Sequence, residues 1–180
     1  KRVGLIQKNG SKSDGWYDGA NQTGIYKWQI CLNVDPKTKQ VAAMDYGNDL
    51  PIFLDDIIPD GMELIQSGEL APTYKYAYNV YGETSDTIKD KVPDSSAFGI
   101  YTYADKMLSA TFSGVGRRVV IFTYYTRLDE SFMSGKGDVV FTNNAIYSDK
   151  DGVLDKGTAT IEKKGNTITK SSTQADNLIT

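Results

Sequence analysis

A two-residue alternation of apolar and polar side chains recurs along this chain and constrains its fold more than any other feature. Between residues 25 and 34, one parity holds Tyr26, Trp28, Ile30 and Leu32, and the other holds Lys27, Gln29, Cys31 and Asn33. Successive side chains of a strand point to opposite faces, so this pattern predicts a half-buried strand. In Arg118–Leu128 both parities are apolar, which predicts a strand in the middle of a sheet.

Other segments have a similar strand-like pattern and are separated by loops rich in Gly, Asp, Asn, Ser and Pro. They are Val3–Lys8, Leu50–Asp56, Met62–Ile65, Tyr74–Val80, Gly99–Tyr103, Met107–Ser113, Val139–Tyr147 and Thr158–Glu162. No long stretch has a helical period, and we expect only short helical turns, near Ser85–Asp90 or Ala104–Leu108. The sequence therefore predicts an all-β sandwich or barrel.

Charge and composition exclude several classes of function. The 180 residues include 20 Lys and Arg against 23 Asp and Glu, a net charge of −3, which is unsuited to binding nucleic acid or an anionic membrane surface. The absence of histidine excludes Ser-His-Asp and Cys-His catalysis and His-ligated zinc. The single cysteine, Cys31, excludes an internal disulfide, and its place on a polar strand face suggests no role. No apolar run reaches the length of a membrane helix. Because the chain starts at Lys1, we expect a fragment or a processed product.

Several segments, taken in order, resemble a known family. They are Tyr26–Asn33 (Y-x-W-x-I-x-L-N), Leu54–Met62 (close to D-x-[IL]-P-x-G-[ML]), Val120–Thr126, and Phe141–Ala145 (F-x-N-x-A). The series resembles the immunoglobulin-like domains of Gram-positive cell-wall adhesins and pilins, of the collagen-adhesin A-region type, over roughly Val3–Lys163. The resemblance implies an immunoglobulin-like β-sandwich in an extracellular, wall-attached surface protein.

The resemblance also implies a self-formed isopeptide bond, in which a lysine of the first strand joins an asparagine of a late strand with help from a nearby acid. Matched by motif position, the lysine is Lys8, the acid is Asp56 and the asparagine is Asn143. Burial keeps the lysine amine neutral and nucleophilic, and it keeps the acid protonated, so that the acid donates to the amide carbonyl. Apolar neighbours exclude water, so that amide exchange outcompetes hydrolysis.

The strand pattern leaves a rival for each of these residues. Asp56 ends an apolar stripe that points to the core, but Asp55 also shares its face with apolar residues. Asn143 is flanked by core-type residues, yet parity alone does not exclude Asn144. Lys12 is the alternative lysine, although we expect it in a loop rich in Gly, Ser and Asp.

The expected function is structural: a stiff module of a surface adhesin or pilus, not an enzyme, with no cofactor and no metal. The alternative is a ligand-binding domain that recognises a host matrix protein or a glycan, with unknown binding residues. We expect one domain over residues 1–163. Residues 164–180 form a polar tail in which Asn166–Ser172 echoes Gly4–Ser11. The echo fits either chance similarity in a solvated tail or the first strand of a following repeat. Neighbouring repeats would then be partners, and no membrane insertion is expected.

Two further patterns have a plainer explanation. The stripe of Tyr74, Tyr76 and Tyr78 resembles a ligand platform, but such stripes more often pack across strands. The Asp149–Gly152 segment, followed by Asp155, resembles part of a calcium loop. It lacks the later bidentate Glu of an EF-hand, so an Asp-Gly turn is favoured.

Overall fold

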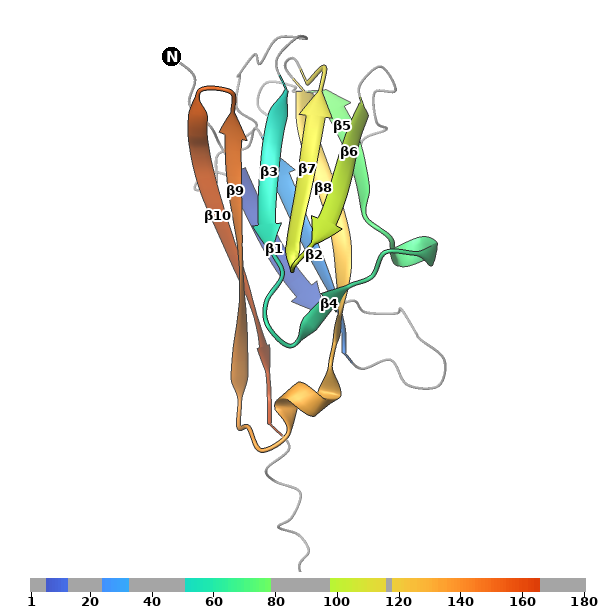
Figure 1. Ribbon diagram of the computed structural model, residues 1–180, viewed down its shortest axis with the longest axis vertical. Coiled ribbons are helices and arrows are strands. Elements are labelled where there is room, and N and C mark those ends of the chain that lie inside the picture. The colour runs from blue at the N-terminus through green and yellow to red at the C-terminus, as the bar shows by residue number, and fades with distance from the viewer. Residues whose placement is uncertain (1–5, 13–23, 33–50, 79–97, 116–117, 166–180) are drawn as a thin grey trace, which may run out of the picture.

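The computed structural model describes residues 6–12, 24–32, 51–78, 98–115 and 118–165. These residues form two antiparallel sheets that lie face to face, with β10, β9, β3, β7 and β6 in front of β1, β2 and β8 in Figure 1. The all-β class predicted from the alternation is confirmed, and so is the sandwich that the resemblance implies.

The first sheet is built around its longest strand, β8. Its strands are β1 (Ile6–Lys12), β2 (Ile25–Leu32), β8 (Arg118–Leu128), β4 (Met62–Leu64) and β5 (Thr73–Tyr78). One edge of β8 pairs with β2, and the other edge pairs with β4 and β5. This central position explains why both faces of β8 are apolar, as predicted.

The second sheet carries the late strands of the chain. In spatial order its strands are β10 (Gly152–Lys163), β9 (Val139–Asp149), β3 (Ile52–Ile57), β7 (Met107–Ser113) and β6 (Phe98–Ala104). β3 therefore lies in the middle, with β9 on one side and β7 on the other.

One apolar core fills the space between the sheets. It includes Trp28, Ile30, Phe122 and Phe141, each no more than 2% exposed. The predicted inward parity of β2 is thus confirmed, because its even-numbered residues belong to this core. The indole nitrogen of Trp28 is satisfied within it, since it donates to Oγ1 of Thr126 over 2.9 Å.

The prediction that Cys31 lies on a polar strand face was wrong. Its side chain is fully buried in a small second cluster with Val119 and Ile121, on the parity opposite to the main core. Cys31 pairs directly with Ile121 in the β2–β8 register. The alternation misassigned this face because one polar neighbour on each side made it look solvated.

The turn between β6 and β7 also differs from the expectation of a helical turn at Ala104–Leu108. Ala104 pairs with Met107, and the two residues between them, Asp105 and Lys106, both have positive φ, 52° and 68°. Two successive residues with positive φ are typical of a type I′ hairpin turn, whose twist matches that of the strands. The helical turn expected at Ser85–Asp90 lies outside the described residues.

Two short 3-10 helices, η1 (Gly68–Leu70) and η2 (Glu130–Met133), interrupt the strands. Asp129 caps η2, since its carboxylate accepts from the backbone N–H of Ser131 over 2.9 Å. The ring of Phe132 in η2 lies over Gly61, which has a φ of 86°. η2 thereby braces the turn between β3 and β4. No helix in the described ranges is long and apolar enough to cross a membrane.

Candidate functional site

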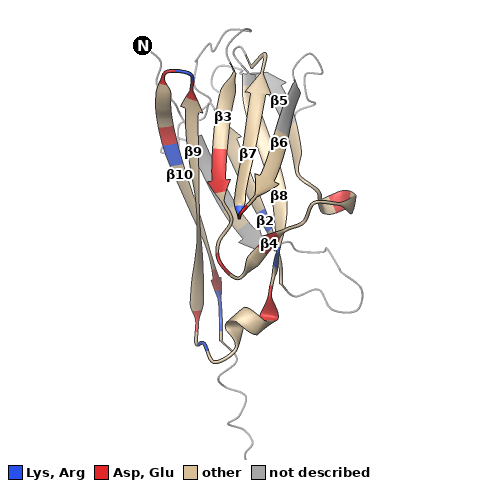
Figure 2. Cartoon of the chain, viewed as in Figure 1, with Lys and Arg blue, Asp and Glu red and all other residues tan. Residues whose placement is uncertain are grey.

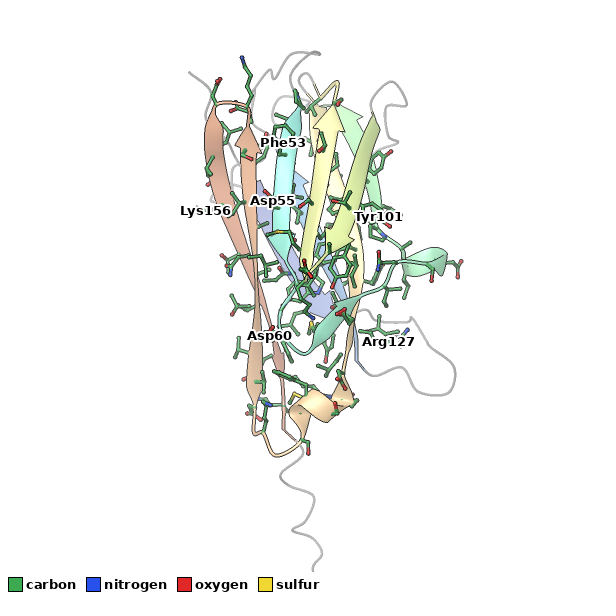
Figure 3. All side chains as sticks on the ribbon, in the orientation of Figure 1. Phe53, Asp55, Asp60, Tyr101, Arg127 and Lys156 are labelled. Carbon is green, nitrogen blue, oxygen red and sulfur yellow. The ribbon has the colours of Figure 1, made fainter. Side chains whose placement is uncertain are left out.

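Asp56 lies in the core and Asp55 does not. Asp56 is fully buried in β3, where its backbone pairs with Leu108 on one side and Ala145 on the other. Asp55 lies on the outer face of β3, where Oγ of Ser109 donates to its carboxylate over 2.7 Å. Figure 2 shows the acidic pair as a red segment of β3, and Figure 3 labels Asp55 beside Phe53. The pleat thus sends two neighbouring carboxylates to opposite faces.

The same alternation separates the two asparagines of β9. Asn143 is fully buried between Phe141 and Ala145, which point the same way. Asn144 is exposed, and its Oδ1 accepts from Oγ1 of Thr158 in β10 over 2.9 Å. The amide that faces the core is therefore the one at position 143.

Tyr124 of β8 reaches across the core and connects these two residues. Its hydroxyl donates to Oδ2 of Asp56 over 2.6 Å, and the same oxygen accepts from Nδ2 of Asn143 over 2.5 Å. The hydroxyl, the carboxylate and the amide come from three strands and two sheets. They form a short polar chain inside an apolar core.

The burial of this chain keeps the tyrosine protonated. The pKa of Tyr124 lies well above its usual value of 10.0, first because the ring is buried, and then because of the negative charge and hydrogen bond of Asp56. The hydrogen bond from Asn143 works in the other direction. Oδ1 of Asn143 is buried and has no hydrogen-bond partner among the described residues. Such an acceptor is unusual in a folded core and favours a reactive role.

Sequence reasoning missed Tyr124, although a signal was present. The residue occupies an apolar parity of β8 with Val120 and Phe122. A tyrosine on a core-facing parity needs a partner for its hydroxyl. That requirement would have pointed to a buried acceptor on the facing sheet.

The backbone of β1 places Lys8 on a core-facing register. Lys8 pairs with Ile30, and Gly10 pairs with Trp28, so these positions share the face of two buried residues. A Cβ atom at Gly10 would lie 2.6 Å from Cζ3 of Trp28 and 3.2 Å from Cγ1 of Ile161 in β10. The side chain of Lys8, and hence the predicted bond to Asn143, lies outside the described part of the structure.

The expected loop position of Lys12 was wrong. Lys12 is the last residue of β1 and pairs with Tyr26. The strand continues past Lys8 because Gly10, which reads as a loop residue, leaves room for the indole of Trp28. Lys12 therefore has the same parity as Lys8, and parity does not separate the two lysines.

The aspartates at the β9–β10 connection form a hairpin turn. The backbone N–H of Asp151 donates to Oδ1 of Asp149 over 2.8 Å, and Gly152 has a φ of 131°. Within the described ranges, no group of three or more acidic or cysteine side chains could hold a metal ion.

In the tyrosine stripe, Tyr74 pairs with Phe122 and its ring makes an edge contact with Phe112 at 6.1 Å. This contact reaches the facing sheet and supports a packing role for Tyr74.

Comparison with known proteins shows the fold. No protein-family model and no curated protein sequence matches the chain. Among solved structures, the Enterococcus faecalis protein ACE, described as binding its ligands by the collagen hug model, superposes with a TM-score of 0.55 at 13% identity. The match covers 89% of this chain and 51% of the ACE chain. The chain thus spans about half of that protein.

Two further structures are similar at a lower score. The collagen binding subdomain of ACE gives a TM-score of 0.48 at 11% identity, over 91% of this chain and 98% of that one. The collagen-binding domain of a Staphylococcus aureus adhesin gives 0.46 at 11% identity, over 92% and 99%. The predicted resemblance to Gram-positive adhesin domains is thereby confirmed at the level of the fold, through the ACE superposition.

Proposed function

We propose that this chain is a structural module of an extracellular, wall-attached adhesin or pilus, stabilised by a self-formed isopeptide bond between Lys8 and Asn143. The observation that supports it most is the buried contact of Asp56 and Asn143 with one hydroxyl, in the core between the sheets. Burying a carboxylate and an amide without a functional need is unfavourable. Their joint burial fits a reaction that requires a dry site.

The proposed reaction needs a neutral amine, an amide carbon and an acid that moves a proton. Nζ of Lys8 attacks Cγ of Asn143, and ammonia leaves. Lys8 is on the core-facing register of β1, and the facing sheet supplies Asp56 and Asn143. β1 also contacts β10, the strand that pairs with β9, and this arrangement supports the proposal.

The bond would act mainly on the unfolded chain. It would close a loop of roughly 135 residues, which chain-entropy scaling values at about 5 kcal/mol. The chain has one cysteine and so no internal disulfide. An amide cross-link would replace a disulfide and resist reduction, which suits a surface protein under tension.

Intact-mass spectrometry of the purified chain tests the proposal. The measured mass should lie below the sequence mass by one ammonia, and a tryptic digest should contain a branched peptide that joins Lys8 to Asn143. A full-mass protein would contradict the cross-link. A branch that maps to Lys12 would support isopeptide formation and would show that Lys12, not Lys8, is the reacting lysine.

The similarity to ACE favours a second candidate function, binding of a host matrix protein such as collagen. Glycan binding belongs to the same candidate class. Immobilised collagen and a glycan array, each probed with the chain, test this alternative. Saturable binding would support a ligand-binding domain, and no binding would leave the structural module as the function.

We also propose that the domain ends near Lys163, where β10 ends. Beyond it, the N–H of Gly165 donates to the carboxylate of Asp138 over 2.8 Å. The tail from residue 166 lies outside the described residues, and its role as the first strand of a following repeat stays a proposal. Removing residues 166–180 should then leave the thermal unfolding midpoint unchanged.

A further inference from the structure

The hydroxyl of Tyr124 lies between the acid and the nitrogen that must leave. Nδ2 of Asn143 donates to this hydroxyl, and the hydroxyl donates to Oδ2 of Asp56. The resemblance assigns roles to a lysine, an acid and an asparagine, but it gives no role to Tyr124, which lies in the matched segment Val120–Thr126. The structure inserts this tyrosine from the opposite sheet.

We propose that Tyr124 is a catalytic residue, whose hydroxyl relays a proton from Asp56 to the leaving nitrogen of Asn143. The inference rests on the proposed cross-link and adds the route by which ammonia is released. It assigns a chemical task to a hydroxyl that would otherwise only fill the core.

Before the reaction, each hydrogen bond runs in the donor-to-acceptor direction that this relay requires. An amide nitrogen is a donor without a basic lone pair, so Nδ2 of Asn143 donates to the tyrosine oxygen before reaction. When Nζ of Lys8 attacks Cγ, the carbon becomes tetrahedral and the nitrogen becomes a basic amine. The same hydrogen bond then reverses, and the tyrosine becomes the donor.

The proton balance closes within the site. The bond between Nζ of Lys8 and Cγ of Asn143 forms, and the bond between Cγ and Nδ2 breaks. Asp56 starts as the carboxylate that accepts from Tyr124, not as the protonated acid that the resemblance implies. It takes the proton that Nζ loses and passes a proton to the tyrosine oxygen. The tyrosine passes its own proton to Nδ2, which leaves as ammonia. Asp56 and Tyr124 end as they began, and no oxidant or reductant takes part.

The burial of Tyr124 supports this role. Its pKa is held well above 10.0 by burial and by the charge of Asp56, so the hydroxyl carries its proton at neutral pH. The ring is fixed by its neighbours, with the ring centre of Phe122 at 5.9 Å. A fixed, protonated hydroxyl within hydrogen-bond reach of both groups meets the geometric requirement for proton transfer.

The test measures the rate of bond formation in the whole chain. The protein is made by cell-free translation, aliquots are quenched in denaturant at set times, and intact mass gives the cross-linked fraction. Tyr124→Phe keeps the ring and removes the hydroxyl, and we expect a rate on the order of 100-fold lower than wild type. Tyr147→Phe is the matched control, because Tyr147 is another fully buried tyrosine in the same core. Its rate should equal that of wild type.

A second variant separates proton transfer from packing. Fluorotyrosine introduced at position 124 by suppression of a stop codon keeps the ring and hydroxyl, but makes the hydroxyl a stronger acid. The relay predicts faster ammonia release, whereas a packing role predicts an unchanged rate. This variant also keeps the test valid if Tyr124→Phe does not fold.

The outcomes distinguish the two proposals. A wild-type protein of full mass would overturn the cross-link itself. A cross-linked wild type with equal rates for Tyr124→Phe and Tyr147→Phe would overturn the relay and leave the cross-link standing. An unchanged rate with fluorotyrosine would also overturn the relay.

Discussion

The hydroxyl of Tyr124 in β8 donates to Oδ2 of Asp56 in β3 over 2.6 Å, and so joins the two sheets through their shared core. A buried carboxylate needs such a donor, because burying an unsatisfied charge is strongly unfavourable. The pairing links the two sheets at one point of the core, and Asn143 contacts the same hydroxyl.

Removal of the buried acid should prevent the cross-link. We expect Asp56→Ala to keep the full sequence mass, because no acid then moves the proton. Its thermal midpoint should fall by on the order of 10 °C, as the cross-link's restraint on the unfolded chain is lost. Intact mass and calorimetry measure both effects.

Asp55→Ala is the matched control for this variant. It removes a carboxylate from the neighbouring position, on the outer face beside Ser109. It should lose one ammonia like the wild type and unfold within a few degrees of it. A cross-linked Asp56→Ala protein would show that another acid assists the reaction.

The two asparagines of β9 should respond in opposite ways. Asn143→Ala removes the amide that reacts, so the protein should have the full mass of its own sequence. Asn144→Ala removes only an exposed contact with Thr158, and should change the free energy of unfolding by about 0.5 kcal/mol or less. Mass spectrometry and urea unfolding distinguish them, and full-mass Asn144→Ala would refute the assignment to Asn143.

A side chain at Gly10 should destabilise the sandwich. A Cβ atom there would lie 2.6 Å from the ring of Trp28, so Gly10→Ala should reduce the free energy of unfolding by about 1–3 kcal/mol. Gly137→Ala is the control, because no atom lies within 4 Å of its added Cβ. Urea unfolding of both variants gives the comparison, and equal stabilities would show that β1 packs differently.

Alkaline pH should weaken the fold through Tyr124. The raised pKa keeps this tyrosine protonated in the folded state, whereas in the unfolded chain it ionises near pH 10. Below about pH 10, Tyr124 is protonated in both states, and its full contribution to the free energy of unfolding is present. Above it the unfolded state binds fewer protons, so the free energy of unfolding falls as pH rises.

This loss should be smaller in Tyr124→Phe. Unfolding in urea between about pH 9 and pH 11, with Lys8→Ala in both proteins so that neither is cross-linked, measures the two slopes. Parallel slopes would mean that Tyr124 ionises in the folded protein as readily as in the unfolded chain.

The alternation of apolar and polar residues was sufficient to predict the strands and part of the candidate site. The alternation around Trp28 predicted the core-facing parity of β2, and the doubly apolar pattern of β8 predicted a central strand; both are present. The parity of β3 also pointed Asp56 toward the core. These features depend only on the pleat, which any strand imposes on its own residues.

Tertiary structure decided what the pleat leaves open. Which face of β9 is covered depends on the opposite sheet, and that sheet buries Asn143 and exposes Asn144. Cys31 is buried on a face that its polar neighbours made look solvated. The contact of Tyr124 with Asp56 joins residues 68 positions apart. Alternation within a strand carries no information about the partner across the core, so only the packing of the two sheets could place that hydroxyl beside the acid and the amide.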